Sequence, residues 1–285
     1  MRVWKLLRAT EVILTVTLLC RAALAATTAQ TDQQPREPVS QKYRSLWAPR
    51  EEPMGTHEHS TTQVLYAFYG ETTLGPANVI AAVYSLESPG PEGEDATYRV
   101  YLAIIQKSER PTVLQRVDIT DAMPVQTEFP GNFYKMDAVI DALNIASGVT
   151  GVHVNLWAVV AGTGSISGAT DLFYRLDSEE KLDRILELDG TSEYSRLGAR
   201  QASVKDSQIL IGDIDHDGKT EILVEPSYLE IAGINRQVRT EEPTIYRFMG
   251  GRYQAQGRLE SADISKLQVT QLPRSSFIRT INMSK

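Results

Sequence analysis

The chain has 285 residues, of which 42% are hydrophobic, 23% charged and 7% aromatic. This composition excludes disordered, collagen-like and other fibrous proteins, and the length suffices for one large domain or two small ones. The formal net charge of -7 argues against a nucleic-acid partner, because proteins that bind phosphate backbones concentrate Lys and Arg on one surface.

Residues 1–25 have the three parts of a secretory signal peptide. Arg2, Lys5 and Arg8 precede an apolar run from residue 12 to residue 20, and the sequence Ala-Leu-Ala at 23–25 provides a cleavage signal. The apolar run is far shorter than the ~20 residues that a membrane-spanning helix needs. The pattern therefore predicts an exported protein, periplasmic or extracellular, whose mature form has no transmembrane anchor.

Cys20 is the only cysteine of the chain. If it leaves with the signal peptide, the mature protein has no disulfide, although its compartment would permit one. Cleavage just before Cys20, followed by lipidation, is the alternative; residues 17–19 match poorly the small residues that such a site needs.

Residues 26–60 form a segment with little to bury. They contain four prolines among Gln, Thr, Ser and charged residues, and Leu46 and Trp47 are their only substantial apolar pair. This composition predicts a disordered or extended linker that precedes a domain at 61–285.

From residue 61 onward, short runs rich in Val, Ile, Leu and Tyr alternate with clusters of Gly, Pro, Asp and Ser. Such runs predict β-strands. The expected strands are 63–69, 78–86, 98–106, 112–119, 152–161, 170–176, 209–214, 221–225 and 244–248. Segments 136–147 and 181–186 satisfy a helical or a strand period, and their neighbours favour strands. We therefore expect an all-β fold of antiparallel hairpin units with few helices.

Three segments resemble one another: 98–120, 171–190 and 244–261. Each has an aromatic strand, a polar turn and a second strand that contains an Arg, and consecutive starts are 73 residues apart (171 − 98 and 244 − 171). A repeat of this kind predicts a partial or small β-propeller-like assembly or a β-sandwich of hairpin units. Hairpins in any all-β chain can also look alike, so the pattern leaves both open.

One segment, 209–225, has the residue types and spacing of a calcium loop, placed at 213–221 between two apolar strands. The predicted ligands are the carboxylates of Asp213, Asp215, Asp217 and Glu221 and the backbone carbonyl of Lys219. Ca²⁺ takes six to eight hard oxygen ligands, and Gly218 permits the sharp turn that brings alternate side chains inward. Four carboxylates within nine residues would repel one another without a cation.

Alternatives to this calcium loop are weaker. Val224 stands where an EF-hand has its bidentate Glu, and the flanks are not helical, so the loop is not an EF-hand. Mg²⁺ retains its waters and disfavours sites made only of protein ligands. An Asp-rich turn without an ion, closed by hydrogen bonds to its own backbone, remains the simplest alternative.

The sequence GDIDHDGKTEILVE, which starts at Gly212, resembles the calcium loops of FG-GAP and VCBS-type repeats, found in integrin-like β-propellers and in many exported bacterial proteins. The resemblance implies that Ca²⁺ binds between two strands of a blade, at Asp213, Asp215, Asp217, Lys219 and Glu221. The chain departs from that pattern in two ways: His216 replaces a small residue, and only one such loop is present.

The other motifs of the sequence give little evidence of a function. The glycine-rich segment 162–168 precedes a strand-like run rather than a helix, so we expect a hairpin loop and not a dinucleotide site. The segment His57-Glu58-His59 lies in the linker without a third metal ligand, and His153 alternates with Val152 and Val154, which predicts an exposed or partly buried strand face. No carboxylate pair is singled out for glycan hydrolysis.

These observations predict an exported, calcium-binding, all-β module that is not an enzyme and that binds a protein or a glycan. The first alternative is a periplasmic inhibitor or immunity-type protein directed against a cell-wall hydrolase. This alternative rests on analogy with other exported β proteins that have one such calcium loop. The second is a glycan hydrolase, which would need a deep cleft with two facing carboxylates.

Overall fold

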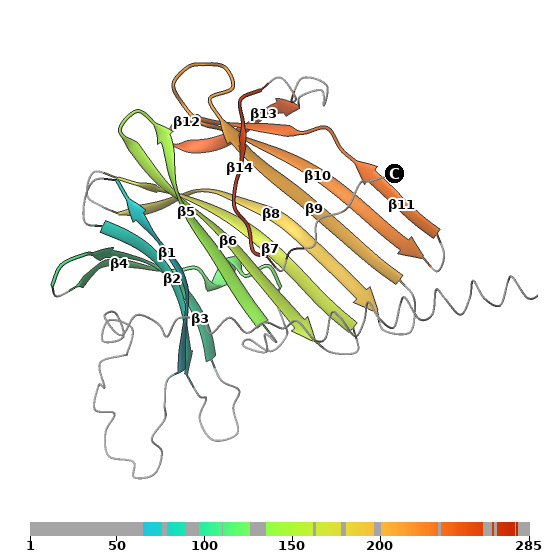
Figure 1. Cartoon of the computed structure of the whole chain (residues 1–285), viewed down its shortest axis with the longest axis horizontal. Helices are drawn as coiled ribbons and strands as arrows, with labels where there is room; N and C mark the ends of the chain where they lie inside the picture. Colours follow the sequence, from blue (N-terminus) through green and yellow to red (C-terminus); the bar gives the residue numbers. More distant parts are fainter. Residues whose placement is uncertain are drawn as a thin grey trace, which may run out of the picture. The chain divides into compact units, whose positions relative to one another are not determined.

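A computed structural model of the chain provides the structure (Figure 1). It describes residues 65–75, 79–88, 97–109, 111–125, 135–161, 164–177, 181–196, 201–232, 235–258, 264, 267–276 and 278. The predicted signal peptide with Cys20, the predicted linker with Trp47, and the histidines at 57 and 59 lie outside the described residues.

The described strands form two antiparallel sheets. The first sheet consists of β1 (Leu65–Leu74), β2 (Val79–Ser88), β3 (Thr97–Gln106) and β4 (Thr112–Asp118), paired in chain order. The short 3-10 turn η1 (Thr120–Ala122) follows β4. Neighbouring strands of this sheet pair antiparallel.

The second sheet has ten strands. Eight of them are paired in sequence along the sheet: β5 (Lys135–Ala146), β6 (Val149–Ala161), β7 (Gly164–Leu176), β8 (Leu182–Arg196), β9 (Gln201–Gly212), β10 (Glu221–Ala232), β12 (Thr244–Met249) and β13 (Arg252–Arg258). In addition, β11 (Asn235–Thr240) pairs with β10, and β14 (Thr270–Gln271) pairs with β9. The all-β, antiparallel class predicted from the sequence is thereby confirmed.

The two ambiguous segments are strands, since they form β5 and the start of β8. The three similar segments each form a hairpin, β3–β4, β7–β8 and β12–β13. They are not separate blades, because β7–β8 lies in the middle of the continuous ten-stranded sheet. Most of the glycine-rich segment 162–168 belongs to β7, which begins at Gly164 and pairs antiparallel with β6, as expected for a hairpin.

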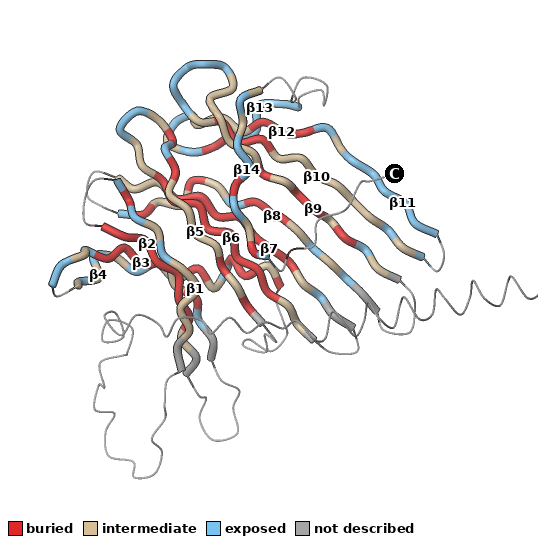
Figure 2. Tube along the Cα trace, viewed as in Figure 1, coloured by how far each residue is buried: buried red, intermediate tan, exposed pale blue. Residues whose placement is uncertain are grey.

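An apolar core joins the two sheets. Its largest cluster combines Val83 and Leu102 of the first sheet with Val154, Leu156 and Leu172 of the second. Figure 2 shows the buried residues concentrated on β2, β3, β6 and β7. The faces that meet are lined by every second residue of each strand, as expected when two sheets pack together.

The other side of β6 is buried as well, and this corrects one expectation. His153 is 0% exposed, whereas the sequence predicted an exposed or partly buried position. Val152 and Val154 face the core shared with the first sheet, and His153 packs on the Phe173 ring at 4.9 Å between ring centroids. The pattern was misread because a strand covered on both sides carries no exposed face.

The described residues 267–276 and 278, here called the C-terminal segment, cross the ten-stranded sheet (Figure 1). The pairing of β8 with β9 ends at Ser192 and Lys205, and β14 pairs instead with Leu210 and Ile211 farther along β9. The C-terminal segment thus occupies the place beside β9 that β8 leaves free.

Within the described residues, no helical segment combines the length and the apolar character that crossing a membrane requires.

Candidate functional site

The acidic loop, residues 213–220, connects β9 to β10. The register of this hairpin pairs Gly212 with Glu221, so the strands close directly below the loop. His216 has φ 60° and Gly218 has φ 82°, both in the left-handed region. Glycine adopts that region without steric cost, and the histidine there is uncommon.

Aspartate side chains organise the backbone of this loop. Gly218 N donates to Asp213 Oδ2 at 3.1 Å, and Lys219 N donates to Asp217 Oδ1 at 2.9 Å. Asp217 N donates to Asp215 Oδ1 at 3.3 Å. These are the local turns that Asp favours, and they hold the loop in one conformation.

Three of the predicted ligands converge. Carboxylate oxygens of Asp213, Asp215 and Glu221 lie within 4.8 Å of one another. Asp213 Oδ1 is buried and has no hydrogen-bond partner. Glu221 is buried at 1% exposure, and its Oε2 accepts a hydrogen bond from Ile214 N at 2.7 Å. The loop therefore gathers negative charge around an acceptor that protein donors leave unused.

The environment of Glu221 disfavours its charge. Burial raises the pKa of this carboxyl above its ordinary value, and the nearby aspartates, Asp215 foremost, raise it further. The hydrogen bond from Ile214 N opposes these effects without cancelling them. A cation beside these oxygens would reverse the balance.

The other two predicted ligands are placed differently. Asp217 lies outside the group of three and forms an ion pair with Lys219, Nζ to Oδ2 at 2.5 Å, which lowers the pKa of Asp217. The Lys219 backbone forms an isolated bridge with Ala146. Arg247 of β12 also reaches the loop, with Nη2 3.2 Å from Asp215 Oδ2. Two basic side chains therefore partly neutralise the loop.

Thr220 connects the end of the loop to the last residues of β5. Its N donates to Ile145 O at 2.8 Å, and its hydroxyl donates to Asn144 O at 2.6 Å. Its own carbonyl accepts a hydrogen bond from the Tyr253 hydroxyl at 2.8 Å. A conformational change in the loop would therefore alter its hydrogen bonds with β5 and β13.

A second polar feature, which the sequence did not reveal, lies under the C-terminal segment. His153 Nε2 is 2.8 Å from Asp171 Oδ1, and Asn155 Nδ2 donates to the same oxygen at 2.9 Å. Ser275 N donates to Asn155 Oδ1 at 2.9 Å, and the Ser275 hydroxyl donates to Asp137 Oδ2 at 2.7 Å. A continuous chain of hydrogen bonds thus runs across β5, β6 and β7.

Within this buried cluster, His153 Nδ1 is buried without a hydrogen-bond partner. Protonation of Nδ1 would leave a buried N–H unsatisfied, so the neutral tautomer with the proton on Nε2, donating to Asp171, fits the site. Asp171 itself lies against Gly190 of β8, where a Cβ atom would overlap its Oδ2.

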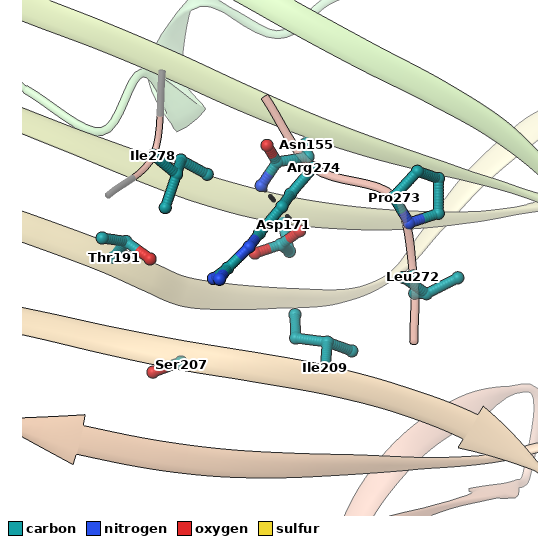
Figure 3. A pocket seen from close by; sticks show the side chains of 9 residues that line it. All are labelled: Asn155, Asp171, Thr191, Ser207, Ile209, Leu272, Pro273, Arg274 and Ile278. Atoms are coloured by element: carbon teal, nitrogen blue, oxygen red, sulfur yellow. Dashed lines mark hydrogen bonds between the residues drawn. The ribbon is translucent and has the colours of Figure 1, made fainter. Parts of the chain in front are cut away.

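Arg274 continues the cluster toward β9. Its Nη1 is 2.5 Å from Asp206 Oδ1, and Asp206 is 1% exposed. Figure 3 shows the Arg274 side chain running past Asn155 and Asp171 toward Thr191, at a small cavity that Leu272 and Ile278 help to line. The cluster therefore has an ion pair with a buried carboxylate, in addition to its other hydrogen bonds.

The described residues define an all-β protein with two polar features, the acidic loop and the buried cluster. No family model, curated protein or solved structure matches the chain. Its function is inferred from the geometry and chemistry of these two features.

Proposed function

We propose that this protein is an exported, calcium-binding, all-β module that binds a protein or glycan partner and is not an enzyme. The observation that carries the calcium part is the convergence of Asp213, Asp215 and Glu221 in one ordered loop. The signal-peptide pattern of residues 1–25 supports export.

Calcium fits this donor set for chemical reasons. Carboxylate and carbonyl oxygens are the ligands it prefers, and its coordination tolerates irregular geometry. Asp213, Asp215 and Glu221 would supply the first oxygens, and the Lys219 carbonyl would add a backbone ligand. Asp217 would join after exchanging its pairing with Lys219 for the ion, since a divalent cation competes well with one exposed ammonium.

The bound ion would stabilise the hairpin that carries it. It would offset the repulsion among the carboxylates and hold β9 and β10 together at their closed end. Through Thr220 it would also stabilise the end of β5. In a mature chain without cysteine, this is a local replacement for a disulfide.

Calorimetric Ca²⁺ titration, paired with thermal melts in Ca²⁺ and in chelator, tests the proposal. For an affinity typical of extracellular modules, a Kd of about 10⁻⁴ to 10⁻³ M, millimolar Ca²⁺ adds no more than about 1–2 kcal/mol to the free energy of unfolding. Equal melting temperatures in both buffers, together with no heat of binding from folded protein, would exclude calcium as the ligand.

Asp215→Ala identifies the loop as the site. Asp215 is a member of the convergent group, so we expect a loss of calcium affinity of about ten-fold or more. The loss of its half-exposed ion pair with Arg247 changes stability in chelator by less than about 1 kcal/mol. Glu242→Gln, at an exposed position outside the loop, removes the same charge and should leave the affinity unchanged.

A further inference from the structure

We propose that the groove between β8 and β9 is a binding site for an extended, arginine-bearing peptide segment of a partner protein, and that the C-terminal segment is its resident ligand within the chain. This inference rests on the proposed role as an interaction module and names the chemistry of the partner. It does not use the acidic loop.

The groove offers main-chain pairing. Beyond Lys205, β8 no longer pairs with β9, and the C-terminal segment pairs with backbone groups of β9 farther along the strand. Thr270 pairs with Ile211, Gln271 pairs with Leu210, and Leu272 N donates to Ile209 O at 2.9 Å. Such pairing accepts any extended segment, because it uses only backbone groups.

Side-chain positions along the groove add selectivity. Leu272 is 5% exposed and packs in the cluster that includes Phe173 and Ile209. Two residues later, the Arg274 guanidinium meets the buried Asp206. The next residue, Ser275, is held by its backbone N–H and by its hydroxyl. The groove thus recognises an apolar residue, then Arg two positions on, then a small hydroxyl residue.

The groove contacts the C-terminal segment through charged groups, which is unusual for a segment that only covers a sheet. Burying an ion pair such as Arg274–Asp206 rarely stabilises a protein more than apolar residues of the same size would. Asp206 and Asp137, both contacted by the C-terminal segment, demand a cationic or hydrogen-bond-donating occupant. A polar groove of this kind gives specificity for its occupant in place of stability.

The backbone pairing between the resident segment and β9 is short. β14 has two residues, and Thr270, Gln271, Pro273 and Ser276 are exposed. A partner segment with a longer strand could pair with more of β9 and displace it. The charge of Asp206 selects partners with Arg at the matching position, because Arg presents several donors to one carboxylate.

The test uses a fluorescently labelled peptide with the sequence of residues 267–278, LQVTQLPRSSFI, titrated into the full chain and followed by anisotropy. In the wild type, the resident segment competes with the peptide. In Arg274→Ala, the resident segment loses its ion pair while the groove stays intact, so we expect binding about ten-fold tighter than to the wild type.

Three controls make this result specific. Arg252→Ala removes an exposed arginine from β13 and should bind the peptide as the wild type does. A peptide with Ala in place of its Arg should not bind Arg274→Ala. Adding Asp206→Asn to Arg274→Ala should remove the gain, because the groove then lacks its carboxylate.

The proposal is overturned if folded Arg274→Ala binds the Arg peptide no better than the Ala peptide. If thermal melts show that Arg274→Ala does not fold, Ser275→Ala, which removes the hydroxyl contact with Asp137, is measured in the same way. If the wild type forms concentration-dependent dimers that are absent in Asp206→Asn, the groove binds a second copy of this chain. That result would overturn the proposal of a different partner protein.

Peptide titrations in chelator and in millimolar Ca²⁺ separate this proposal from the calcium proposal, because no predicted calcium ligand lines the groove. Peptide binding without calcium binding contradicts only the calcium site. Calcium binding without selective peptide binding contradicts only the groove.

Discussion

The hydroxyl group of Tyr174 is buried without a hydrogen-bond partner. Tyr174 is 1% exposed, belongs to the core between the two sheets, and its hydroxyl has no hydrogen-bond partner. Burial raises the pKa of this phenol from 10.0 to about 12, while Arg184 acts in the opposite direction. The neutral hydroxyl is thus a polar atom that the fold desolvates without compensation.

Tyr174→Phe should therefore stabilise the protein. Removing an unsatisfied buried hydroxyl should raise the free energy of unfolding by about 1 kcal/mol at neutral pH. Chemical denaturation of both proteins, compared at equal m-values, measures the difference. A loss of stability in Tyr174→Phe would mean that the hydroxyl has a partner.

The same substitution should change the response to alkaline pH. A raised folded-state pKa gives stability that is complete below the unfolded value and is lost as pH rises through the folded value. For Tyr174 this window extends from pH 10.0 to about 12. We expect the stability difference between Tyr174→Phe and the wild type to widen across that window, and denaturation series at several pH values would show a constant difference if the shift were absent.

At the scale of single elements, β8 determines where the buried cluster forms. Its pairing with β7 shifts register between Ala169 and Thr170, and Gly190 is the residue that this bulge accommodates. Bulges bend a strand and redirect its side chains. Because Gly190 has no side chain, the Asp171 carboxylate can lie against β8 and still reach His153 and Asn155.

Gly190→Ala should be costly for this reason. The new Cβ would overlap Asp171 Oδ2 and lie 3.1 Å from the Ala169 carbonyl oxygen, so we expect a loss of about 2 kcal/mol in the free energy of unfolding. Gly70→Ala is the control, since its nearest contact is Ile140 Cγ2 at 3.4 Å, and its effect should stay within about 0.5 kcal/mol. If thermal melts show equal losses of stability for Gly190→Ala and Gly70→Ala, the Asp171 side chain can move aside at no cost.

At the scale of the whole described molecule, the two sheets depend on one core. The first sheet has four strands, and its apolar residues Val83 and Leu102 are in the same cluster as Val154 and Leu172 of the second sheet. A face of either sheet would expose many apolar side chains if the other unfolded. The sheets are therefore expected to unfold together.

Calorimetry checks this cooperativity. A single thermal transition, with a calorimetric enthalpy equal to the van't Hoff enthalpy, is the expected result. Val154→Ala, which removes two buried methyl groups from the shared core, should lower the midpoint of the whole transition without splitting it. Two separate transitions in either protein would show that the sheets fold independently.

The sequence was sufficient for features in which the determining residues are neighbours along the chain. The expected strand 98–106 matches β3, and 112–119 matches β4 within a residue, because runs rich in β-branched, apolar and aromatic residues identify strands locally. The acidic loop was also found, because Asp213, Asp215 and Glu221 lie within one hairpin connection. Only the placement of Asp217 with Lys219 differed.

Tertiary structure decided the remaining features. The first half of β9 was not predicted, because it has few apolar residues, and its place in the sheet comes from pairing with β10 and β8. His153 was misplaced because the burial of the second side of β6 depends on distant residues. The buried cluster joins Asp137 to Ser275, which are 138 residues apart, and adjacent strands each contribute one or two members. The residue pattern of a segment is enough to predict that it forms a strand. Which of its polar residues are buried depends on the distant parts of the chain that pack against them.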